Sequence, residues 1–89
     1  MTTVWVVAES RFEWYEIKHI CSTMKIALMR WNELRLKLIK ENQEMVEDCV
    51  KNNYDPIPWS TNITFLHNLN PGDECNCDYP DLKEWVVEE

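Results

Sequence analysis

The chain has 89 residues, 45% of them hydrophobic, and a formal net charge of −7, which fits one small acidic domain. One glycine and four prolines argue against a disordered chain and against a glycine-rich phosphate loop. No stretch approaches the roughly 20 apolar residues of a membrane span, and the N-terminus lacks the features of a signal peptide. We therefore expect a single cytoplasmic domain over residues 1–89, without membrane contact and with reduced cysteines.

Two β-strands are expected near the N-terminus. Residues 3–8 are rich in β-branched and aromatic side chains on both faces, which predicts a central strand. Residues 14–21 alternate in part, with Tyr15, Ile17 and Cys21 on one predicted face, which indicates a second strand. Because the polar connection between the two strands is short, an antiparallel hairpin is predicted.

A long helix is predicted over residues 23–51, because this stretch has no Gly or Pro and is rich in strong helix formers. Ser22 and Thr23 offer a hydroxyl for the N-cap. Arg35 and Asn42 interrupt the apolar face, so the second half of the helix is expected to pack on the segment that follows it or to reach toward a partner. The predicted apolar face holds Met24, Ala27, Leu28, Trp31, Leu34, Leu38, Ile39, Met45, Val46 and Cys49.

After the helix, a proline-bounded loop with Trp59 leads to residues 62–67, which we interpret as a short third strand. A turn is indicated at residues 70–73, and a final strand at residues 79–88, where Pro80 favours an edge position. Together these elements predict an α+β fold. It is a two-layer ββα(β)β sandwich in which one long helix packs on a small, mostly antiparallel sheet.

The negative charge is concentrated in the last quarter of the chain. Residues 68–89 hold seven Asp or Glu against Lys83, a charge of −6 from seven negative groups and one positive group. Such a surface repels nucleic acid and attracts basic partners, so we expect no direct binding of nucleic acid. Asp81, Glu84 and Glu88 are candidate partner-binding acids. A DNA mimic that occupies a basic nucleic-acid site is one alternative function.

Three apolar side chains of the helix, Ile26, Met29 and Leu36, face away from the predicted sheet. Exposed apolar patches often mark interfaces, which makes these residues candidates for partner binding or for self-association into a homo-oligomer. The alternative is that the loop over residues 53–62 folds back and covers them. Trp59 in that loop is a candidate anchor for a partner, or else a plug for the core beneath the loop.

Cys75 and Cys77, with His67 upstream, form the one cluster with metal-ligand character, and a small structural zinc module is a second alternative function. The spacing of the two cysteines is shorter than in usual zinc sites, so no cofactor is expected. Cys21 and His19 would share a face of the second strand, but no orienting group or oxyanion donor accompanies them. The sequence therefore predicts a protein that is not an enzyme.

The order of these features resembles a broad class of short, mostly uncharacterised phage and bacterial proteins. The resemblance is carried by Val4-Trp5-Val6-Val7, by Cys21-Ser22-Thr23 before the helix, by residues 27–34, and by the tyrosine and acidic strand of residues 79–89. It implies the ββα-plus-strand fold and a phage origin. We accordingly expect a phage-encoded factor that binds and modulates or inhibits a host protein in the host cytoplasm.

Overall fold

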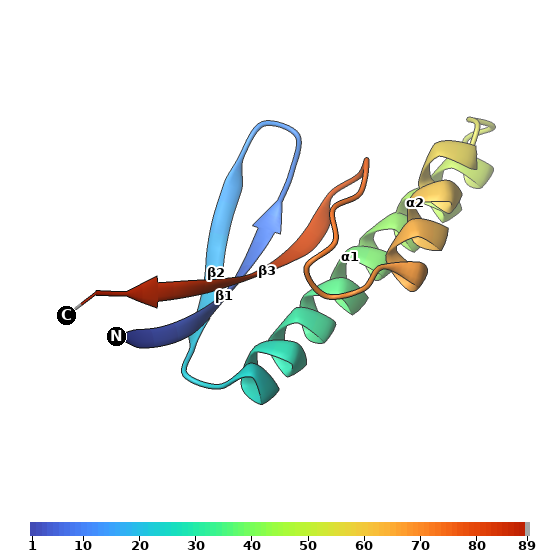
Figure 1. Cartoon of the computed structure of the whole chain (residues 1–89). Coiled ribbons are helices and arrows are strands. Elements are labelled where there is room, and N and C mark those ends of the chain that lie inside the picture. The colour runs from blue at the N-terminus through green and yellow to red at the C-terminus, as the bar shows by residue number, and fades with distance from the viewer. Residues whose placement is uncertain (89) are drawn as a thin grey trace.

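The computed structural model describes residues 1–88 and contains a three-stranded sheet and two helices (Figure 1). This arrangement confirms the predicted α+β class with a long helix on a small antiparallel sheet. β1 is the central strand, and both of its neighbours pair with it in the antiparallel direction, in the order β2-β1-β3. The elements are β1 (Thr2–Ser10), β2 (Tyr15–Cys21), α1 (Met24–Lys51), α2 (Ile57–Asn68) and β3 (Tyr79–Val87).

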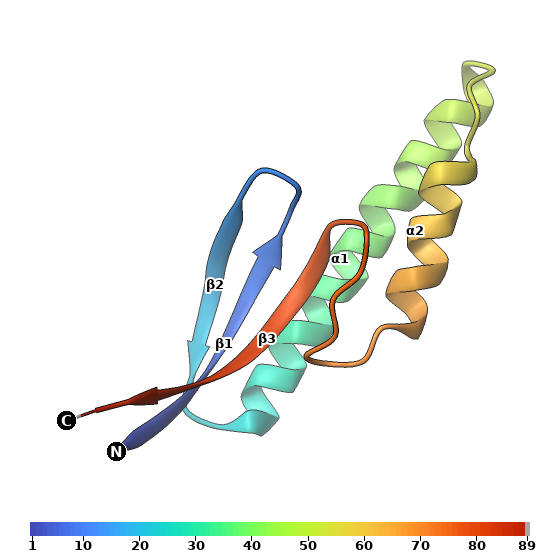
Figure 2. The ribbon, with the colours of Figure 1, turned by 45° about the horizontal axis from the view of Figure 1, so that its top comes forward.

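The molecule is elongated, with principal extents of 56 × 24 × 17 Å. The N-terminal half of α1 lies against the sheet, and its C-terminal half continues beyond the sheet with α2 alongside (Figure 2). Thr2 pairs with Val87, so the start of β1 and the end of β3 form a two-stranded ribbon. This ribbon extends beyond the layer formed by the helices.

A β-bulge in β2 changes which side chains share a face. Ile17 and His19 stand opposite consecutive residues of β1, so no residue of β1 stands opposite Lys18. The extra residue shifts the alternation by one position, which corrects the predicted face: Tyr15 and Ile17 point away from α1, whereas Cys21 points toward it.

The main core lies between α1 and the inner face of the sheet. Trp31 crosses this core, and its indole Nε1–H donates a hydrogen bond of 2.9 Å to the buried carbonyl oxygen of Pro80. The predicted apolar face of α1 is buried along most of its length, although Met24, Leu28 and Met45 remain exposed. The buried cluster contains Val7, Cys21, Ala27, Trp31, Leu34, Leu38, Ile39, Leu66 and Leu82.

Residues 62–67 lie in the helix α2, so the prediction of a third strand there was wrong. Asp55 Oδ1 accepts a hydrogen bond of 2.9 Å from the backbone N–H of Ile57, and Pro58 lies in the first turn, where proline is tolerated. Leu66 is fully buried against the core. Tertiary packing therefore outweighs the strand propensity of this segment.

Polar contacts from α1 hold α2 in place. Arg35 Nη1 donates to the carbonyl oxygens of Leu66 and His67 at 3.4 and 3.3 Å, which satisfies carbonyls at the end of α2. Asn62 Nδ2 donates to Asn42 Oδ1 at 3.2 Å, and Asn42 Nδ2 in turn donates to a carbonyl of α1. The two polar residues that interrupt the apolar face of α1 thus bind α2, which confirms that the second half of α1 packs on the following segment.

Thr23 is the N-cap of α1, and its Oγ1 accepts a hydrogen bond of 3.3 Å from the backbone N–H of Ile26. Replacing Thr23 by Ala is expected to lower the free energy of unfolding by about 0.5–2 kcal/mol, because that donor loses its partner. The neighbouring Ser22→Ala is the matched control and is expected to change stability by less than about 0.5 kcal/mol. Urea unfolding followed by circular dichroism measures both, and equal effects would contradict the assignment of the cap.

Candidate functional site

The face of the sheet that points away from α1, the outer sheet face, is the most apolar exposed region built by the strands. Val6 and Ala8 form its centre and are fully buried by their neighbours, although neither belongs to the core beneath α1. Strand register places larger side chains from β2 and β3 around them. These are Tyr15, Ile17, Ile20, Trp85 and Val87, each between 42% and 64% exposed. An apolar surface of this kind is typical of an interface.

The charged residues at outer-face positions of the three strands largely satisfy one another. Tyr15 donates its hydroxyl hydrogen to Asp81 Oδ2 at 2.8 Å. Lys83 Nζ lies 3.5 Å from the same oxygen and 5.5 Å from the centre of the Tyr15 ring. Burial, together with the hydrogen bond and charge of Asp81, raises the pKa of Tyr15 above its ordinary value. Asp81 is thus a buried structural group on this face.

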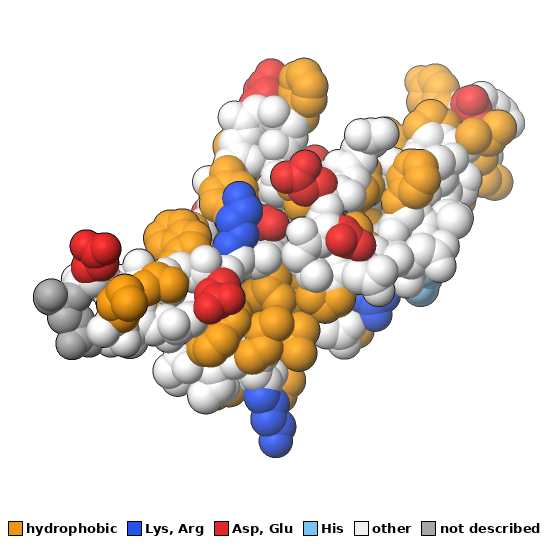
Figure 3. Space-filling view, in the orientation of Figure 1, with side chains coloured by type: hydrophobic (Ala, Val, Ile, Leu, Met, Phe, Trp, Pro, Cys, Tyr) orange, Lys and Arg blue, Asp and Glu red, His pale blue; other side chains and the backbone are white. Residues whose placement is uncertain are grey.

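Figure 3 shows hydrophobic side chains over the strands near the termini and over the adjoining part of α1, with single acidic side chains scattered among them, at the hairpin tip and over the loops. The remaining predicted acids, Glu84 and Glu88, are exposed at the end of the chain near Trp85. Register places Glu84 opposite Trp5 and therefore on the face of the sheet toward α1. The predicted acids accordingly do not form one continuous acidic surface with Asp81.

The predicted outer row of α1 is exposed as expected. Ile26, Met29 and Leu36 are all solvent-accessible, and the chain after α1 does not cover them because it folds onto another side of the helix as α2. Their role in binding stays a prediction. This row and the outer sheet face come from different layers, so the chain presents two separate apolar surfaces.

Trp59 is half-buried in the first turns of α2, so its predicted position in a loop was wrong. It lines a cavity of about 470 Å³ between the helices and the sheet end, together with Glu44, Met45, Asp48 and Asp78. Four of the eight residues that line the cavity are acidic, and the guanidinium of Arg11 also reaches it. Trp59 and Met45 contribute apolar walls, so Trp59 borders a groove of mixed character.

Arg11, directly after β1, is the centre of an ion-pair cluster that joins three elements. Its Nε lies 3.0 Å from Glu9 Oε2, its Nη1 lies 2.7 Å from Asp78 Oδ2 and its Nη2 lies 3.2 Å from Glu41 Oε2. Lys37 adds a second cation 3.4 Å from the buried carboxylate of Glu9. The cluster ties the end of β1 to α1 and to the residue before β3.

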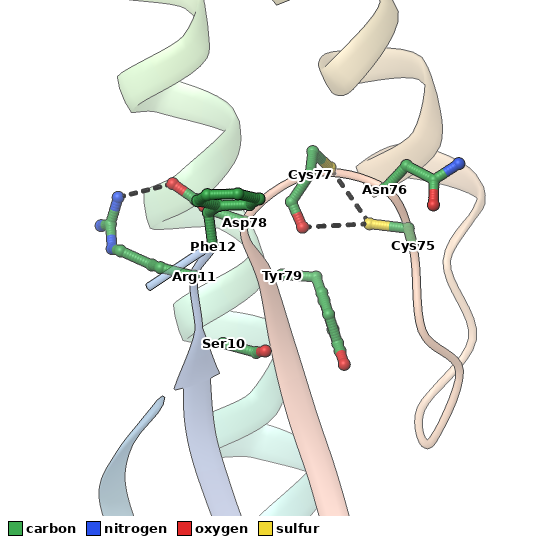
Figure 4. A pocket seen from close by; sticks show the side chains of 8 residues that line it. All are labelled: Ser10, Arg11, Phe12, Cys75, Asn76, Cys77, Asp78 and Tyr79. Carbon is green, nitrogen blue, oxygen red and sulfur yellow. Dashed lines mark hydrogen bonds and ion pairs between the residues drawn. The ribbon is translucent and has the colours of Figure 1, made fainter. Parts of the chain in front are cut away.

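A cavity of about 390 Å³ opens beside this cluster, between the hairpin and the loop that precedes β3. Figure 4 shows Arg11, Phe12 and Asp78 on one side of it and the segment Cys75-Asn76-Cys77 on the other. The sulfur atoms of Cys75 and Cys77 are 3.0 Å apart. The structure thus brings together the two cysteines that the sequence singled out.

The third metal candidate, His67, lies exposed on α2. Within residues 1–88, no three His, Cys, Asp or Glu side chains come together as a metal ion would require.

On β2, Cys21 is buried and His19 is exposed on the same face. In the same described part of the chain, no helix is both long and apolar enough to traverse a bilayer.

Sequence reasoning missed Ile20 and Trp85 as surface residues. Trp85 belongs to a strand that alternates Lys83, Trp85 and Val87 on one side, a pattern that indicates a second, exposed apolar face. Ile20 gave no such signal, because the bulge at Lys18 reverses the alternation before it.

Comparison with protein-family models, with curated proteins and with solved structures finds no match to this chain.

Proposed function

We propose that this protein acts by binding another protein through the outer sheet face and does not catalyse a reaction. The observation that carries the proposal is a nearly charge-neutral sheet face with large exposed apolar side chains around the fully covered Val6 and Ala8. Interface centres are depleted in charge and enriched in aromatic residues, and Tyr15 and Trp85 supply the aromatic component here.

The partner surface that fits is apolar at its centre and carries an acidic group at its rim. Lys83 is the exposed cation of the outer sheet face, and its single carboxylate contact at 3.5 Å leaves ammonium hydrogens available. The resemblance to short phage proteins favours a host protein as the target, with modulation or inhibition as the result of binding. The proposed binding surface on this chain, the outer sheet face, does not depend on which organism supplies the partner.

Mimicry of DNA is the weaker proposal, because two of the seven acidic residues of the last quarter are already used within the fold. Asp78 is paired with Arg11, and Asp81 is buried beneath Tyr15 and Lys83. A mimic needs carboxylates that are free to meet basic groups of a nucleic-acid site. The apolar face therefore supports protein binding better than the acidic residues support mimicry.

Ile20→Asp is the variant that tests the proposed surface. Ile20 is 64% exposed in the free protein, so the fold is expected to tolerate the change. In a complex the new carboxylate would be buried without a partner, which costs more than the ~1.4 kcal/mol that corresponds to tenfold in affinity. We expect at least about tenfold weaker retention of a stoichiometric partner in affinity capture from bacterial lysate with quantitative mass spectrometry.

Met29→Asp is the matched control, because Met29 is 57% exposed on the outer row of α1. This variant is expected to retain the partner at the level of the unmodified chain. Loss of the partner with Met29→Asp alone would move the interface to α1. Absence of a stoichiometric partner with the unmodified chain would argue against a binding function. Circular dichroism of both variants confirms that the fold is intact.

A further inference from the structure

The segment Cys75-Asn76-Cys77 places two thiols in direct contact on the wall of a cavity. Their sulfur atoms are 3.0 Å apart, and Cys75 Sγ also lies 3.8 Å from the backbone carbonyl oxygen of Cys77. Both cysteines are half-buried, and both line the cavity of about 390 Å³ beside Arg11 (Figure 4). This volume falls in the range of sites that hold small molecules.

The remaining cysteines have a different environment. Cys21 packs in the core between α1 and the sheet, and Cys49 is buried near the end of α1. Buried thiols in apolar surroundings are inert structural groups, whereas accessible thiolates carry the reactivity of cysteine. The chain therefore contains one accessible thiol pair and, in Cys21 and Cys49, its own internal controls.

The two thiols of the pair are chemically unequal. Burial raises the pKa of Cys77 to about 12, with further contributions from the hydrogen bond and charge of Cys75 and from Asp78. Cys77 therefore holds its proton more strongly than an ordinary thiol, and the two sulfur atoms are close enough for one S–H to bridge them. A nucleophilic thiolate beside a protonated thiol is the arrangement that thiol–disulfide exchange requires.

We propose that Cys75 and Cys77 form a dithiol site that exchanges with small disulfides such as glutathione disulfide. The Cys75 thiolate attacks one sulfur of the disulfide, a new S–S bond forms, and the other half leaves as a thiolate that takes up a proton. Cys77 then loses its proton to solvent and attacks Cys75 Sγ, which releases the second half as a thiol. The protein dithiol is oxidised by two electrons, and one small disulfide is reduced to two thiols.

The ring closed by Cys75 and Cys77 spans one intervening residue. So short a connection disfavours relaxed disulfide geometry, and strained disulfides are more readily reduced. The site is therefore suited to reversible exchange. The cavity adjoins the outer sheet face at Ser10, the register partner of Tyr15, but Ile20 does not line it, so the dithiol chemistry and the proposed binding function are tested with different variants.

The experiment incubates the folded full chain with glutathione disulfide and follows the intact mass, with peptide mapping of the products. The unmodified chain is expected to lose two hydrogens, at Cys75 and Cys77. Cys77→Ser is expected to accumulate a mixed disulfide at Cys75, because the second thiol is missing. Cys75→Ser is expected to react more slowly than Cys77→Ser, because burial, the largest cause of the raised pKa of Cys77, remains in that variant and lowers its thiolate fraction.

Cys49→Ser is the control and is expected to react like the unmodified chain. The proposal is overturned if the folded chain does not exchange, if the new bond involves Cys21 or Cys49, or if Cys75→Ser and Cys77→Ser react at equal rates. Circular dichroism of each variant excludes unfolding as the source of a difference. None of these outcomes depends on whether a protein partner is captured.

Discussion

Replacing Arg11 by Met is expected to lower the free energy of unfolding by about 2–4 kcal/mol, a large share of the stability of a small domain. Arg11 contacts the carboxylates of Glu9, Glu41 and Asp78, and the side chain of Glu9 is only 2% exposed. The variant leaves that buried carboxylate with the single contact to Lys37 at 3.4 Å. Urea unfolding at neutral pH measures the loss.

The effect of this substitution depends on pH. Burial by itself raises the pKa of Glu9, but the hydrogen bonds and charges of Arg11 and Lys37 outweigh burial, so the pKa lies below its ordinary value of 4.5. A carboxyl with a lowered pKa stabilises the fold above its ordinary pKa, and this contribution is lost as the pH falls through the folded-state value. The difference in stability between the unmodified chain and Arg11→Met is therefore expected to narrow in acid.

Lys37→Met is the control for Arg11→Met, because Lys37 is more exposed and contacts Glu9 at a longer distance. It is expected to cost less than about 1 kcal/mol. If the loss of unfolding free energy in Arg11→Met were the same at neutral pH and in acid, the ionised carboxylate of Glu9 would not be the source of that loss. Equal losses for the two variants would show that Arg11 is not the centre of the cluster.

Replacing Trp31 by Ala is expected to lower the free energy of unfolding by about 3–5 kcal/mol. Trp31 is buried between α1 and β3, and its indole N–H binds the carbonyl oxygen of Pro80 at 2.9 Å. The variant removes a large apolar side chain and leaves a buried carbonyl without its donor. Thermal and urea unfolding followed by circular dichroism measure the loss.

Trp31→Phe separates the two contributions, because phenylalanine keeps most of the apolar volume but has no donor. It is expected to lose about 1–3 kcal/mol, the cost of an unsatisfied buried acceptor. If Trp31→Phe were as stable as the unmodified chain, the bond to Pro80 would contribute nothing. If Trp31→Phe were as unstable as Trp31→Ala, the loss of apolar packing would account for the smaller part of the destabilisation.

The elements that the sequence predicts correctly are those whose local and tertiary signals agree. α1 combines strong helix formers, a hydroxyl at Thr23 and an apolar face, and it runs unbroken from Met24 to Lys51. The hairpin and β3 likewise match their strand-forming composition, and Pro80 lies on an edge strand as expected. In these segments the tertiary structure confirms a preference that the residues already have.

α2 could not be read from propensity, because its β-branched and aromatic residues favour a strand. Two weaker signals were available: Trp59, Ile63 and Leu66 follow helical spacing, and Pro58 suits a first helical turn. What decides the conformation is the surface of α1, which buries Leu66 and supplies Arg35 to the carbonyls at the end of α2. Those interactions are long-range and leave little trace in a local window of sequence.

The candidate site was predictable only in part. The sequence singled out the pair Cys75 and Cys77 and the exposed row of α1, but it assigned Asp81 to recognition, whereas the fold buries it. The sequence shows that Asp81 is charged, but it does not show that Tyr15 donates a hydrogen bond to it or that Lys83 forms an ion pair with it in the fold. The outer sheet face depends on strand register, and the bulge makes that register unreadable from alternation alone.

The bulge at Lys18 also governs how this sheet can associate with other strands. β2 and β3 are the edges of the sheet, and a bulged edge with a lysine is a poor template for an incoming strand. β3 also carries Pro80 and Lys83, which disfavour strand addition, but it has regular register with β1 along its whole length, so the part of its outer edge after Pro80 is the better template. A sheet with one usable edge can pair once, edge to edge, to give a closed dimer. Growth into a fibril needs two usable edges, and the single extra residue in β2 works against it.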